Sequence, residues 1–429
     1  MKPIRILLLG SGGREHAIAW KISQSKNCEK LYIAPGNAGT STCGENVDIA
    51  VSDFLGIQSF CLREHIDMVI VGPEEPLVKG IYDYFQSDAA LRNIAMIGPS
   101  KEAARLEGSK AFAKAFMLRH NIPTASYREF DANNYEEGVE YLREHSIPIV
   151  LKADGLAGGK GVIICNNHVE AMAEFELMLQ HAKFGEAGEK VVVEEFLQGI
   201  ELSVFVLTDG KDYVLLPEAK DYKRIGEGDH GLNTGGMGAV SPVPFADGEF
   251  MEKVRQRIIE PTVRGLREEK LDYKGFIFFG LIRVGGEPFV IEYNCRMGDP
   301  ETEVVIPRLR SDLVETFLAV SQQRVSEIKL DIDHRAATTV MAVSAGYPGP
   351  YEKGFEIEGL DVLNEDDVMV FHSGTRMFDG KLVTDGGRVL TVTAFGENIV
   401  KAVHRSNKIM EFIYFTGMYY RKDIGYEFT

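Results

Sequence analysis

Short apolar runs alternate with longer amphipathic stretches over about the first hundred residues of the chain. The runs IRILLL, KLYIA, DMVIVG and IAMIG have the length and composition of buried strands, and helical patterns lie between them. This alternation is typical of a parallel sheet with crossover helices. Three of the runs lead into the segments GSGGRE, APGNAG and GPEEP. Because ligands bind beyond the carboxyl ends of such strands, we expect these segments to form one binding site.

The rest of the chain divides into three further regions by its pattern. SKAFAKAFMLRH predicts a helix from Ser109 to His120, and PIVLKADGLAGGKGVIIC predicts a strand, a glycine loop and a second strand. Further on, VVVEEFLQGIELSVFVL, GFIFFGLIRV and PFVIEYN predict strands, and GLNTGGMGAVSPV predicts a loop. A β-rich region with a closing helix follows. We therefore predict an N-terminal domain (1–102), a central domain (103–122 and 191–328), a small domain (123–190) and a C-terminal domain (329–429).

Composition and charge narrow the classes of protein. The 429 residues are 45% hydrophobic and carry a formal net charge of -17, which indicates a globular protein without general affinity for nucleic acid. The five cysteines form no C-x-x-C pair, which favours free thiols in a reducing compartment. The longest apolar runs are shorter than the ~20 residues of a membrane helix. We therefore expect a cytoplasmic protein without nucleic-acid or membrane partners.

The segment GSGGREH begins like a dinucleotide-binding loop. Gly10 and Gly12 fit the fingerprint G-x-G-x-x-G, but Glu15 stands where the third glycine is needed. The second predicted strand also ends in YIAPGNAG, without the acidic residue that binds a ribose. A nicotinamide-linked oxidoreductase is therefore a disfavoured alternative. We interpret His16 as a polar residue at a helix start.

The segment LKADGLAGGKGV has the composition of a phosphate-binding loop. Four glycines surround Lys160, and Lys152 lies on the preceding strand, so backbone amides and ammonium groups are available to phosphate oxygens. The pattern is not a Walker A motif, because Gly161 follows Lys160 in place of Ser or Thr. The alternative interpretation is a glycine-rich hairpin with solvated lysines.

Polar residues alternate at the end of the predicted strand PFVIEYN. Glu292 and Asn294 are two residues apart and share a face, and their oxygens are ligands that suit Mg²⁺. Arg296 continues this face and suits a phosphate or a carboxylate, whereas Cys295 points to the core. The alternative is a polar strand end with a surface ion pair.

Two other segments give weaker signals. In VVVEEFLQGIE, the acids at the strand end together with Glu201 could accept ribose hydroxyls, and the backbone near Phe196 and Leu197 could contact an adenine edge. A solvated strand edge is the alternative. In PEAKDYKRIGEGDHGLNTGGMGA, Asp221 precedes a glycine-rich loop that either approaches a ligand or lies on the surface.

The motifs resemble a known family when they are taken in order: GSGGREHA, APGNAGT, VGPEEPLVKG, EGSKAFAK, LKADGLAGGKGV, NTGGMGA, EYNCRMGDPET and RKDIG. They are similar to those of ATP-grasp enzymes and, within these, of the phosphoribosylamine–glycine ligase family, over essentially the whole chain. The resemblance implies an α/β ATP-grasp fold: an N-terminal parallel-sheet (pre-ATP-grasp) domain, a small lid domain, a central domain and a C-terminal β-rich domain.

The resemblance also implies an activity. ATP would drive the ligation of glycine to 5-phosphoribosylamine through a glycyl phosphate, giving glycinamide ribonucleotide, ADP and phosphate in purine synthesis. Mg²⁺ or Mn²⁺ would be required, the partners would be these small molecules, and the chain would be a monomer. Another ATP-grasp carboxylate–amine ligase with a different acid substrate, or a nucleotide sensor without catalysis, are the alternatives.

By the same resemblance, individual residues acquire expected roles. The nucleotide would be bound by Lys110, Lys152, Gly158, Gly159, Lys160, Gly161, Glu194, Glu195, Leu197 and Glu201. The metal would be bound by Glu292 and Asn294, and 5-phosphoribosylamine by Gly12, Gly13, Arg14, Asn37 and Glu74. Arg296 and Asp221 would face glycine and the acyl phosphate and would be catalytic together with Lys152. Lys220 and Leu232 depart from the family pattern near the substrate loop, and no second strand acid stands opposite Glu292.

Overall fold

The computed structural model describes residues 2–428 except 157–160, 182 and 361–364. The N-terminal domain is a five-stranded parallel sheet in the order β3-β2-β1-β4-β5. Its strands are β1 (Ile4–Gly10), β2 (Cys28–Pro35), β3 (Glu45–Asn46), β4 (Met68–Val71) and β5 (Ala95–Ile97). Its helices are α1 (Gly13–Ile22), α2 (Phe54–Glu64), α3 (Glu74–Lys79) and α4 (Ile81–Ser87). The four apolar runs are therefore strands of one parallel sheet, as predicted.

Strand β1 is apolar from Ile6 to Leu9 because both of its faces are buried there. Leu7 and Leu9 belong to one hydrophobic core, and Ile6 and Leu8 belong to a second. Residues of the central domain complete both cores, so the N-terminal and central domains share their interior.

Two helices, α5 (Arg105–Gly108) and α6 (Lys110–Arg119), lead out of the N-terminal domain. The Ser109 side chain caps α6 by accepting a hydrogen bond from the backbone N–H of Phe112, and His120 ends the helix. The predicted helix from Ser109 to His120 is confirmed.

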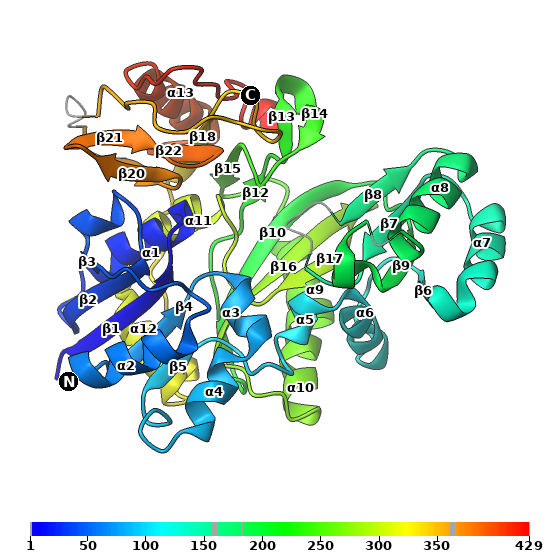
Figure 1. Ribbon diagram of the computed structural model, residues 1–429, viewed down its shortest axis with the longest axis horizontal. Coiled ribbons are helices and arrows are strands. Elements are labelled where there is room, and N and C mark those ends of the chain that lie inside the picture. The colour runs from blue at the N-terminus through cyan, green and yellow to red at the C-terminus, as the bar shows by residue number, and fades with distance from the viewer. Residues whose placement is uncertain (1, 157–160, 182, 361–364, 429) are drawn as a thin grey trace.

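The small domain is a separate antiparallel sheet with its own core. The strand order is β6-β9-β7-β8, formed by Tyr127–Asp131, Lys190–Glu195, Ile149–Ala153 and Val162–Cys165. Helices α7 (Tyr135–Glu144) and α8 (His168–Leu179) pack on it around Phe130 and Phe175. The domain projects from the body of the molecule (Figure 1).

The central domain is a four-stranded antiparallel sheet in the order β11-β10-β16-β17. The strands are Tyr213–Leu215, Ile200–Thr208, Gly275–Val284 and Glu287–Asn294, respectively. A π-helical turn, Arg255–Ile259, joins helices α9 (Gly248–Val254) and α10 (Glu260–Glu268). Helices α11 (Thr302–Arg308) and α12 (Leu313–Ser321) follow β17.

The C-terminal sheet takes two of its strands from the middle of the chain. Its order is β12-β15-β18-β22-β19, formed by Lys220–Asp221, Gly238–Ser241, Ala336–Val343, Arg388–Gly396 and Val368–His372, and α13 (Ile399–Met410) covers it. Two hairpins flank it: β13 (Arg224–Gly226) with β14 (His230–Asn233), and β20 (Thr375–Phe378) with β21 (Lys381–Thr384).

The pattern predicts that the segment GLNTGGMGAVSPV is one loop, and this prediction is wrong. It contains the end of β14, a turn, and β15, which pairs with β18. Its glycines hide the strand because they carry no side chain. At Gly238 the backbone lies so close to β18 that a Cβ would be 2.6 Å from the carbonyl oxygen of Thr339.

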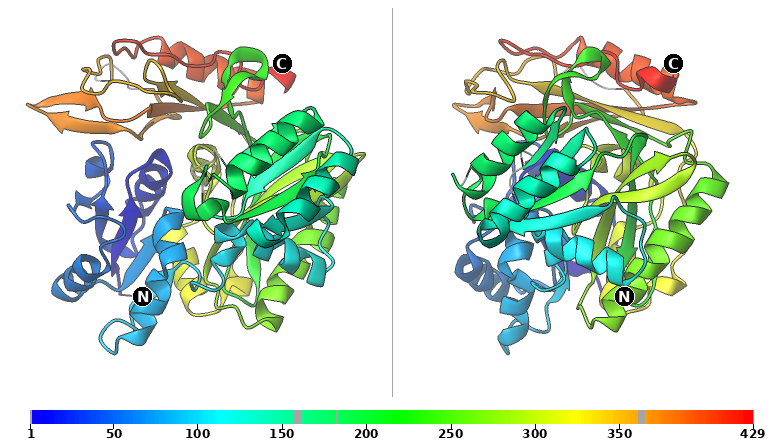
Figure 2. Two further views of the ribbon diagram at one scale, coloured as in Figure 1. Left: turned by 45° about the vertical axis from the view of Figure 1, so that its right-hand side comes forward. Right: turned by 90° about the vertical axis from the view of Figure 1, so that its right-hand side faces the viewer.

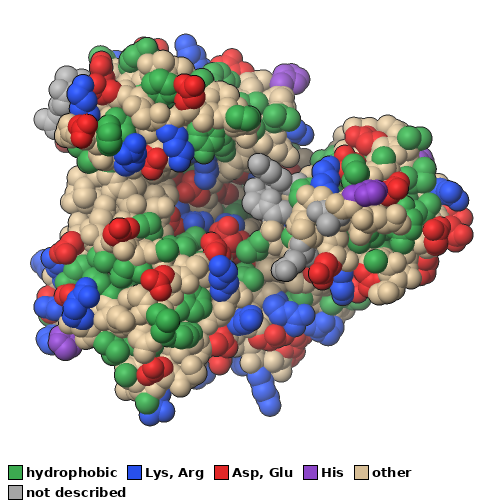
Figure 3. Space-filling model, viewed as in Figure 1, with side chains coloured by type: hydrophobic (Ala, Val, Ile, Leu, Met, Phe, Trp, Pro, Cys, Tyr) green, Lys and Arg blue, Asp and Glu red, His purple; other side chains and the backbone are tan. Residues whose placement is uncertain are grey.

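The domains surround a common hollow. The C-terminal domain lies over the N-terminal and central domains (Figure 2). Figure 3 shows a hollow, lined in part by acidic and basic side chains, where the N-terminal, C-terminal and small domains face one another. Within the described residues, no helix is long and apolar enough to cross a membrane. Short 3₁₀ turns complete the fold at Thr40–Thr42, Ala132–Asn134, Gly185–Gly188, Glu227–Asp229, Val325–Glu327 and Tyr426–Phe428.

Candidate active site

The loop after β1 is filled by the side chain of Glu15. The backbone N–H of Gly12 donates to Glu15 Oε2 over 2.7 Å. A Cβ on Gly10 or Gly72 would overlap this carboxylate, so the glycines leave room for Glu15. In a dinucleotide site a glycine occupies the position that Glu15 has here, and it lets the helix pack close to the pyrophosphate. The geometry therefore gives no support to the oxidoreductase alternative.

Arg14 and Asn37 tie this loop to other parts of the molecule. Arg14 donates from Nε to Glu15 Oε1 over 2.6 Å and from a terminal nitrogen to the carbonyl of Met297 over 3.2 Å. Asn37 Nδ2 donates to the carbonyls of Ser11 over 2.8 Å and His372 over 2.7 Å. The strand ends that were predicted to form one site are thus brought together, and they contact both the central and the C-terminal domain.

His16 lies near the start of α1, as expected, and it is buried. Its Nδ1 accepts a hydrogen bond from the backbone N–H of His372 over 2.8 Å. Phe371 packs edge-on against its ring. The sequence pattern could not reveal this contact, because the C-terminal strand that covers α1 is distant along the chain.

Arg296 lies between the N-terminal loops and strand β17. Its guanidinium is 3.3 Å from Glu74 Oε2 and 2.6 Å from Glu107 Oε1, and it donates to Asn294 Oδ1 over 3.0 Å. Although burial opposes ionisation of Glu74, the guanidinium groups of Arg296 and Arg14 hold the pKa of Glu74 below its usual range. Arg296 therefore connects the proposed substrate loop with the proposed metal ligands.

Glu292 and Asn294 lie on one face of β17, as predicted. They stand opposite Gly280 and Phe278 of β16, and a Cβ on Gly280 would be 3.1 Å from Glu292 Cγ. The amide nitrogen of Asn294 is buried and has no hydrogen-bond partner among the described residues, while its oxygen faces Arg296. A carboxylate and an amide oxygen on one face suit Mg²⁺ that shares phosphate oxygens. The described residues contain no group of three or more acidic, His or Cys side chains arranged for a metal.

A buried cluster of two lysines and one glutamate lies beside β17. Lys152 Nζ on β7 is 3.0 Å from Glu194 Oε2 on β9 and donates to the carbonyl of Ile291 over 3.1 Å. Lys114 Nζ on α6 is 3.1 Å from the same Glu194 oxygen. Lys110, one turn before Lys114, donates to the carbonyl of Gly155 over 3.1 Å. From the sequence, Lys114 received no role. The signal that could have identified it is its i, i+4 spacing from Lys110, which places both lysines on one face of α6.

The chain leaves the small-domain sheet directly after β9. Glu195 ends the strand, and its Oε1 accepts from the backbone N–H of Ser126 over 2.7 Å. The next residues, including half-buried Leu197, belong to no strand, so their backbone groups are open to a ligand. Gly161 precedes β8, and its carbonyl accepts from the N–H of Ala153 over 2.8 Å. The predicted lid residues Gly158, Gly159 and Lys160 lie outside the described residues.

A second charged group surrounds Lys223, which also interacts electrostatically with Glu292. Lys223 Nζ is 2.9 Å from Glu201 Oε2 and 3.9 Å from Asp221 Oδ1. Burial raises the pKa of Asp221. Glu301, which the sequence interpretation did not select, is buried and accepts from Ser203 Oγ over 3.0 Å, and burial together with Asp221 raises its pKa to about 7.

The two departures from the family pattern differ in their distance from this group: Lys220 interacts electrostatically with Asp221 and Glu201, and Leu232 lies on β14. Lys220 Nζ pairs with Glu427 Oε1 over 2.8 Å and lies over the ring of Tyr222. Leu232 is 65% exposed on β14. Within the described residues, neither side chain forms a hydrogen bond or an ion pair with Asp221 or Arg296.

A second group of buried charged residues, which the central and C-terminal domains contribute, packs against the loop after β1. Arg388 is 2.9 Å from Asp299 Oδ1, and Asp299 Oδ2 accepts from the N–H of Arg14 over 3.2 Å. Glu303 is fully buried beside Gly13, both of its oxygens lack hydrogen-bond partners within the described residues, and burial raises its pKa well above its usual range.

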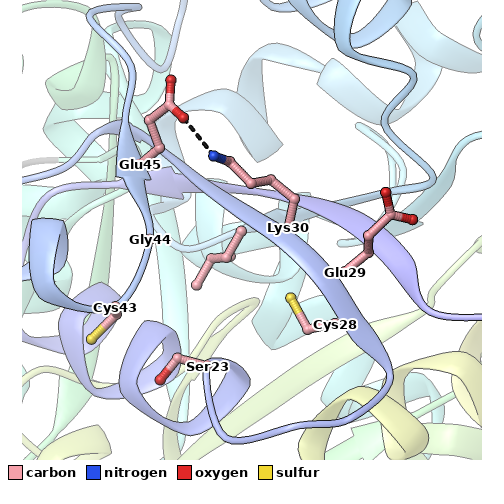
Figure 4. A pocket seen from close by; sticks show the side chains of 8 residues that line it. Ser23, Cys28, Glu29, Lys30, Cys43, Gly44 and Glu45 are labelled. Atoms are coloured by element: carbon pink, nitrogen blue, oxygen red, sulfur yellow. Dashed lines mark ion pairs between the residues drawn. The ribbon is translucent and has the colours of Figure 1, made fainter.

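A cavity of about 350 Å³ lies elsewhere, against the amino-terminal half of β2. Lys30 and Glu45 form an ion pair of 2.7 Å across it, and Cys28 and Cys43 contribute to its wall (Figure 4). Burial raises the pKa of Cys28 to about 11, so this thiol is protonated at neutral pH. The cavity is remote from the strand ends that carry the candidate site.

Two sheets that enclose lysines and a Glu-x-Asn strand, behind a parallel-sheet domain, have the arrangement of an ATP-grasp fold. A solved structure agrees with this fold: a Campylobacter jejuni biotin carboxylase matches 98% of this chain and 94% of its own with a TM-score of 0.71, at 17% identity. The likeness at this identity concerns the fold alone.

Closer relatives identify the family. Models described as phosphoribosylglycinamide synthetase N domain, ATP-grasp (A) domain and C domain match residues 4–107, 108–302 and 337–427. The chain is 47% identical to phosphoribosylamine–glycine ligase of Pasteurella multocida and 46% to that of Yersinia pestis, over 99% of this chain and 98% of each relative. The crystal structure of the Thermotoga maritima ligase matches 98% of this chain and 100% of its own with a TM-score of 0.84 at 34% identity. The chain belongs to the phosphoribosylglycinamide synthetase family, and the expected fold class is confirmed.

Proposed function

We propose that the chain ligates glycine to 5-phosphoribosylamine at the expense of ATP, giving glycinamide ribonucleotide, ADP and phosphate. The single observation that carries this proposal is the position of Arg296, which contacts Glu74 from the parallel-sheet domain and Asn294 of the Glu-x-Asn strand. A substrate at the N-terminal strand ends and a nucleotide at β17 would meet at this guanidinium. The full-length similarity to ligases of this name supports the choice of substrates.

The chemistry needs positioning more than a protein nucleophile. A carboxylate is a poor acyl donor, so ATP first converts glycine to glycyl phosphate, and the amine of phosphoribosylamine then displaces phosphate. Charge stabilisation by lysine and arginine side chains assists both steps. The thiol of Cys295, which directly follows β17, is buried, and burial raises its pKa to about 12, so it is not an activated nucleophile.

The nucleotide would lie between the small and central domains. Lys110 and Lys152 would bind its phosphates, residues 158–161 would cover them, Glu194, Glu195 and Leu197 would line the adenine, and Glu201 would accept the ribose hydroxyls. The separate core of the small domain supports a lid function, since its sheet can move without opening the cores of the other domains. We keep residues 1–102, 103–122 with 191–328, 123–190 and 329–429 as the proposed domains, with two exceptions. Strand β9 (Lys190–Glu195) completes the sheet and the core of the small domain, and β12 and β15 belong to the C-terminal sheet.

Glu292 and Asn294 would hold the metal ion. Mg²⁺, or Mn²⁺ on the same oxygen ligands, would neutralise phosphate charge when bound there. The chain supplies only these two proposed ligands, so the remaining positions are left for phosphate and water oxygens.

The two other substrates would occupy the loops around Arg296. Asp221 would attract the glycine ammonium group, and Arg296 would bind the glycine carboxylate and then the acyl phosphate. Gly12, Gly13, Arg14, Asn37 and Glu74 would hold 5-phosphoribosylamine. These small molecules are the proposed partners; a monomer in the cytoplasm is proposed with them, and the five free cysteines agree with a reducing compartment.

A turnover assay tests the proposal. ADP release by the purified chain should require glycine, 5-phosphoribosylamine and a divalent metal together, with glycinamide ribonucleotide as the product by mass spectrometry. Release of ADP with another amino acid but not with glycine would favour a different ATP-grasp carboxylate–amine ligase. Nucleotide binding without turnover under any of these conditions would instead indicate a sensor.

A further inference from the structure

Glu194 is a carboxylate that two buried lysines share. Its Oε2 is 3.0 Å from Lys152 Nζ and 3.1 Å from Lys114 Nζ, and its other oxygen has no hydrogen-bond partner among the described residues. The exposed fractions of Lys114, Lys152 and Glu194 are 2%, 4% and 3%. All three charges are therefore removed from bulk water.

The two lysines are held differently. Lys114 Nζ also donates to Thr124 Oγ1 over 2.7 Å and is near the carbonyl of Ala125 at 3.4 Å. Thr124 in turn donates to the carbonyl of Val290, so Lys114 is fixed from three directions. Besides Glu194, the described residues give Lys152 one hydrogen-bond partner, the carbonyl of Ile291. Lys152 is thus the more easily released of the two.

The cluster carries an excess of positive charge. Two ammonium groups face one carboxylate, and a buried charge without a partner is costly. Burial, only partly opposed by Glu194, lowers the pKa of Lys114 to about 8. An anion that enters beside Lys152 would restore the balance, and nucleotide phosphates are such anions.

We propose that Lys114 is a positioning residue of the nucleotide site, which holds Glu194 so that Lys152 is free to bind the phosphates of ATP. The proposal rests on the function proposed above, since it needs a nucleotide beside Lys152. Lys114 itself does not touch the nucleotide.

The role follows from what would happen without the second ammonium group. Glu194 and Lys152 would then form a buried pair of equal and opposite charges. Moving Lys152 to a phosphate would leave the carboxylate of Glu194 buried and unpaired, which is strongly unfavourable. With Lys114 in place, Glu194 keeps a partner throughout.

The first test measures the dissociation constant of Mg–ATP by calorimetry without glycine or phosphoribosylamine. Lys114→Met should weaken ATP binding by about 10- to 100-fold, and Lys114→Arg should restore it to within a few-fold of wild type. Thr124→Val is the matched control: it removes a hydrogen bond at the same place without changing charge and should alter binding by less than about threefold. KM for glycine in Lys114→Met should stay unchanged when ATP is saturating.

The second test asks whether Glu194 captures Lys152. The double variant Lys114→Met/Glu194→Gln should bind ATP more tightly than Lys114→Met alone, because no carboxylate competes for Lys152. A lysine that merely supports the fold would make the two changes add instead.

A third readout is the pH profile of ATP binding in the wild type. Lys114 faces Glu194, Lys152, Glu195 and the ring of Tyr127. ATP affinity should fall as Lys114 loses its proton near pH 8, and this decrease should be absent in Lys114→Met and shifted upward in Lys114→Arg. This profile also decides the matter if Lys114→Met does not fold.

Each of three results would overturn the proposal. They are wild-type affinity for ATP in Lys114→Met, additive effects in the double variant, and ATP binding by the wild type that does not change between pH 7 and 9. Failure of the proposed function looks different: the wild type would bind ATP with this lysine dependence but would not consume glycine. A wild type without ATP affinity would overturn both.

Discussion

At the scale of single residues, the site consists of charged groups that hold one another in place before any substrate binds. Arg296 is the centre of this arrangement, because it touches Glu74, Glu107 and Asn294 at the same time. A planar guanidinium has enough donors to keep such contacts and still face a ligand. The residues on either side of it can therefore be tested separately.

Glu292→Ala should reduce turnover by about 100-fold or more, because it removes the carboxylate of the proposed metal pair. Activity at increasing Mg²⁺ concentration and the midpoint of thermal unfolding are the measurements. The midpoint should change little, since Glu292 forms no hydrogen bond or ion pair that the described residues show. Near-normal activity would mean that the metal ligands are elsewhere.

Gly13→Ala should raise KM for phosphoribosylamine by about 10- to 100-fold and leave ATP binding unchanged. A Cβ at Gly13 would overlap Glu303 Oε1 and come within 2.8 Å of Ser373 Oγ, so the loop after β1 must shift. Steady-state kinetics with each substrate varied in turn provides the measurement. Gly248→Ala is the matched control, because a Cβ there meets nothing within 4 Å. Equal kinetics in both variants would refute the role of this loop.

Glu301 should make the protein less stable as the pH rises from about 4.5 to about 7. Burial and then Asp221 raise its folded-state pKa from 4.5 to about 7, so the folded state retains a proton that the unfolded state has lost. The loss is up to about 3 kcal/mol in this window. Glu301→Gln should remove this pH dependence in urea unfolding, and an unchanged slope in the variant would contradict the assignment.

The sequence could supply only part of this residue-level picture. Glu292 and Asn294 were found because a strand has a period of two, whereas Arg14 was selected only through the family resemblance. Lys114, Glu301 and Glu303 were missed, because a buried charge is recognisable only by partners that are far along the chain. Glu301, for example, accepts a hydrogen bond from Ser203 Oγ, and only the fold shows that these two residues are in contact.

At the scale of elements, strands with continuous apolar runs were predicted correctly and short polar ones were not. The pattern identified β1, β2, β4 and β5, whose faces are buried on both sides. It did not identify β3, β12 or β14, which are short and rich in polar residues or glycine. Their pairing depends on neighbouring strands, and periodicity within one segment carries no information about a neighbour.

Ser109 should stabilise α6 by about 1 kcal/mol as its N-cap. Its hydroxyl accepts from the N–H of Phe112 over 3.1 Å and donates to Asp154 over 3.0 Å, so it joins the helix to the end of β7. Ser109→Ala should lower the free energy of unfolding in urea by this amount and weaken ATP binding slightly, because Lys110 and Lys114 lie on the helix. Ser109→Thr keeps the hydroxyl and should retain most of the stability; equal losses in both variants would argue against the cap.

At the scale of the whole molecule, the domains are joined by polar contacts around the site. His16 of α1 accepts from the backbone of His372, and Asn37 donates to the carbonyl of the same residue. The N-terminal and central domains also share two hydrophobic cores. Among the described residues, the small domain has a core of its own, formed by its strands and by α7 and α8, so the proposed lid movement involves a part that is packed independently.

The His16–His372 contact should weaken in acid. Burial, and for His16 also His372, lowers the pKa values to about 3 and about 4 from 6.5, so both rings are neutral in the folded protein. Stability from these rings is complete above pH 6.5 and is lost as the pH falls toward their folded-state values. His16→Gln should flatten the dependence of unfolding free energy on pH between 6.5 and 4. The exposed His334→Gln is the control, and the same slope in all three proteins would contradict the prediction.

The entry of β12 and β15 into the C-terminal sheet has a consequence for the chain during synthesis. These strands leave the ribosome well before β18 and β22, which complete their sheet. Until then β15 has an unpaired edge, which is an aggregation hazard in a nascent chain. The C-terminal domain therefore finishes a sheet that was begun in the middle of the chain, and this sheet is complete only after β22 has been translated.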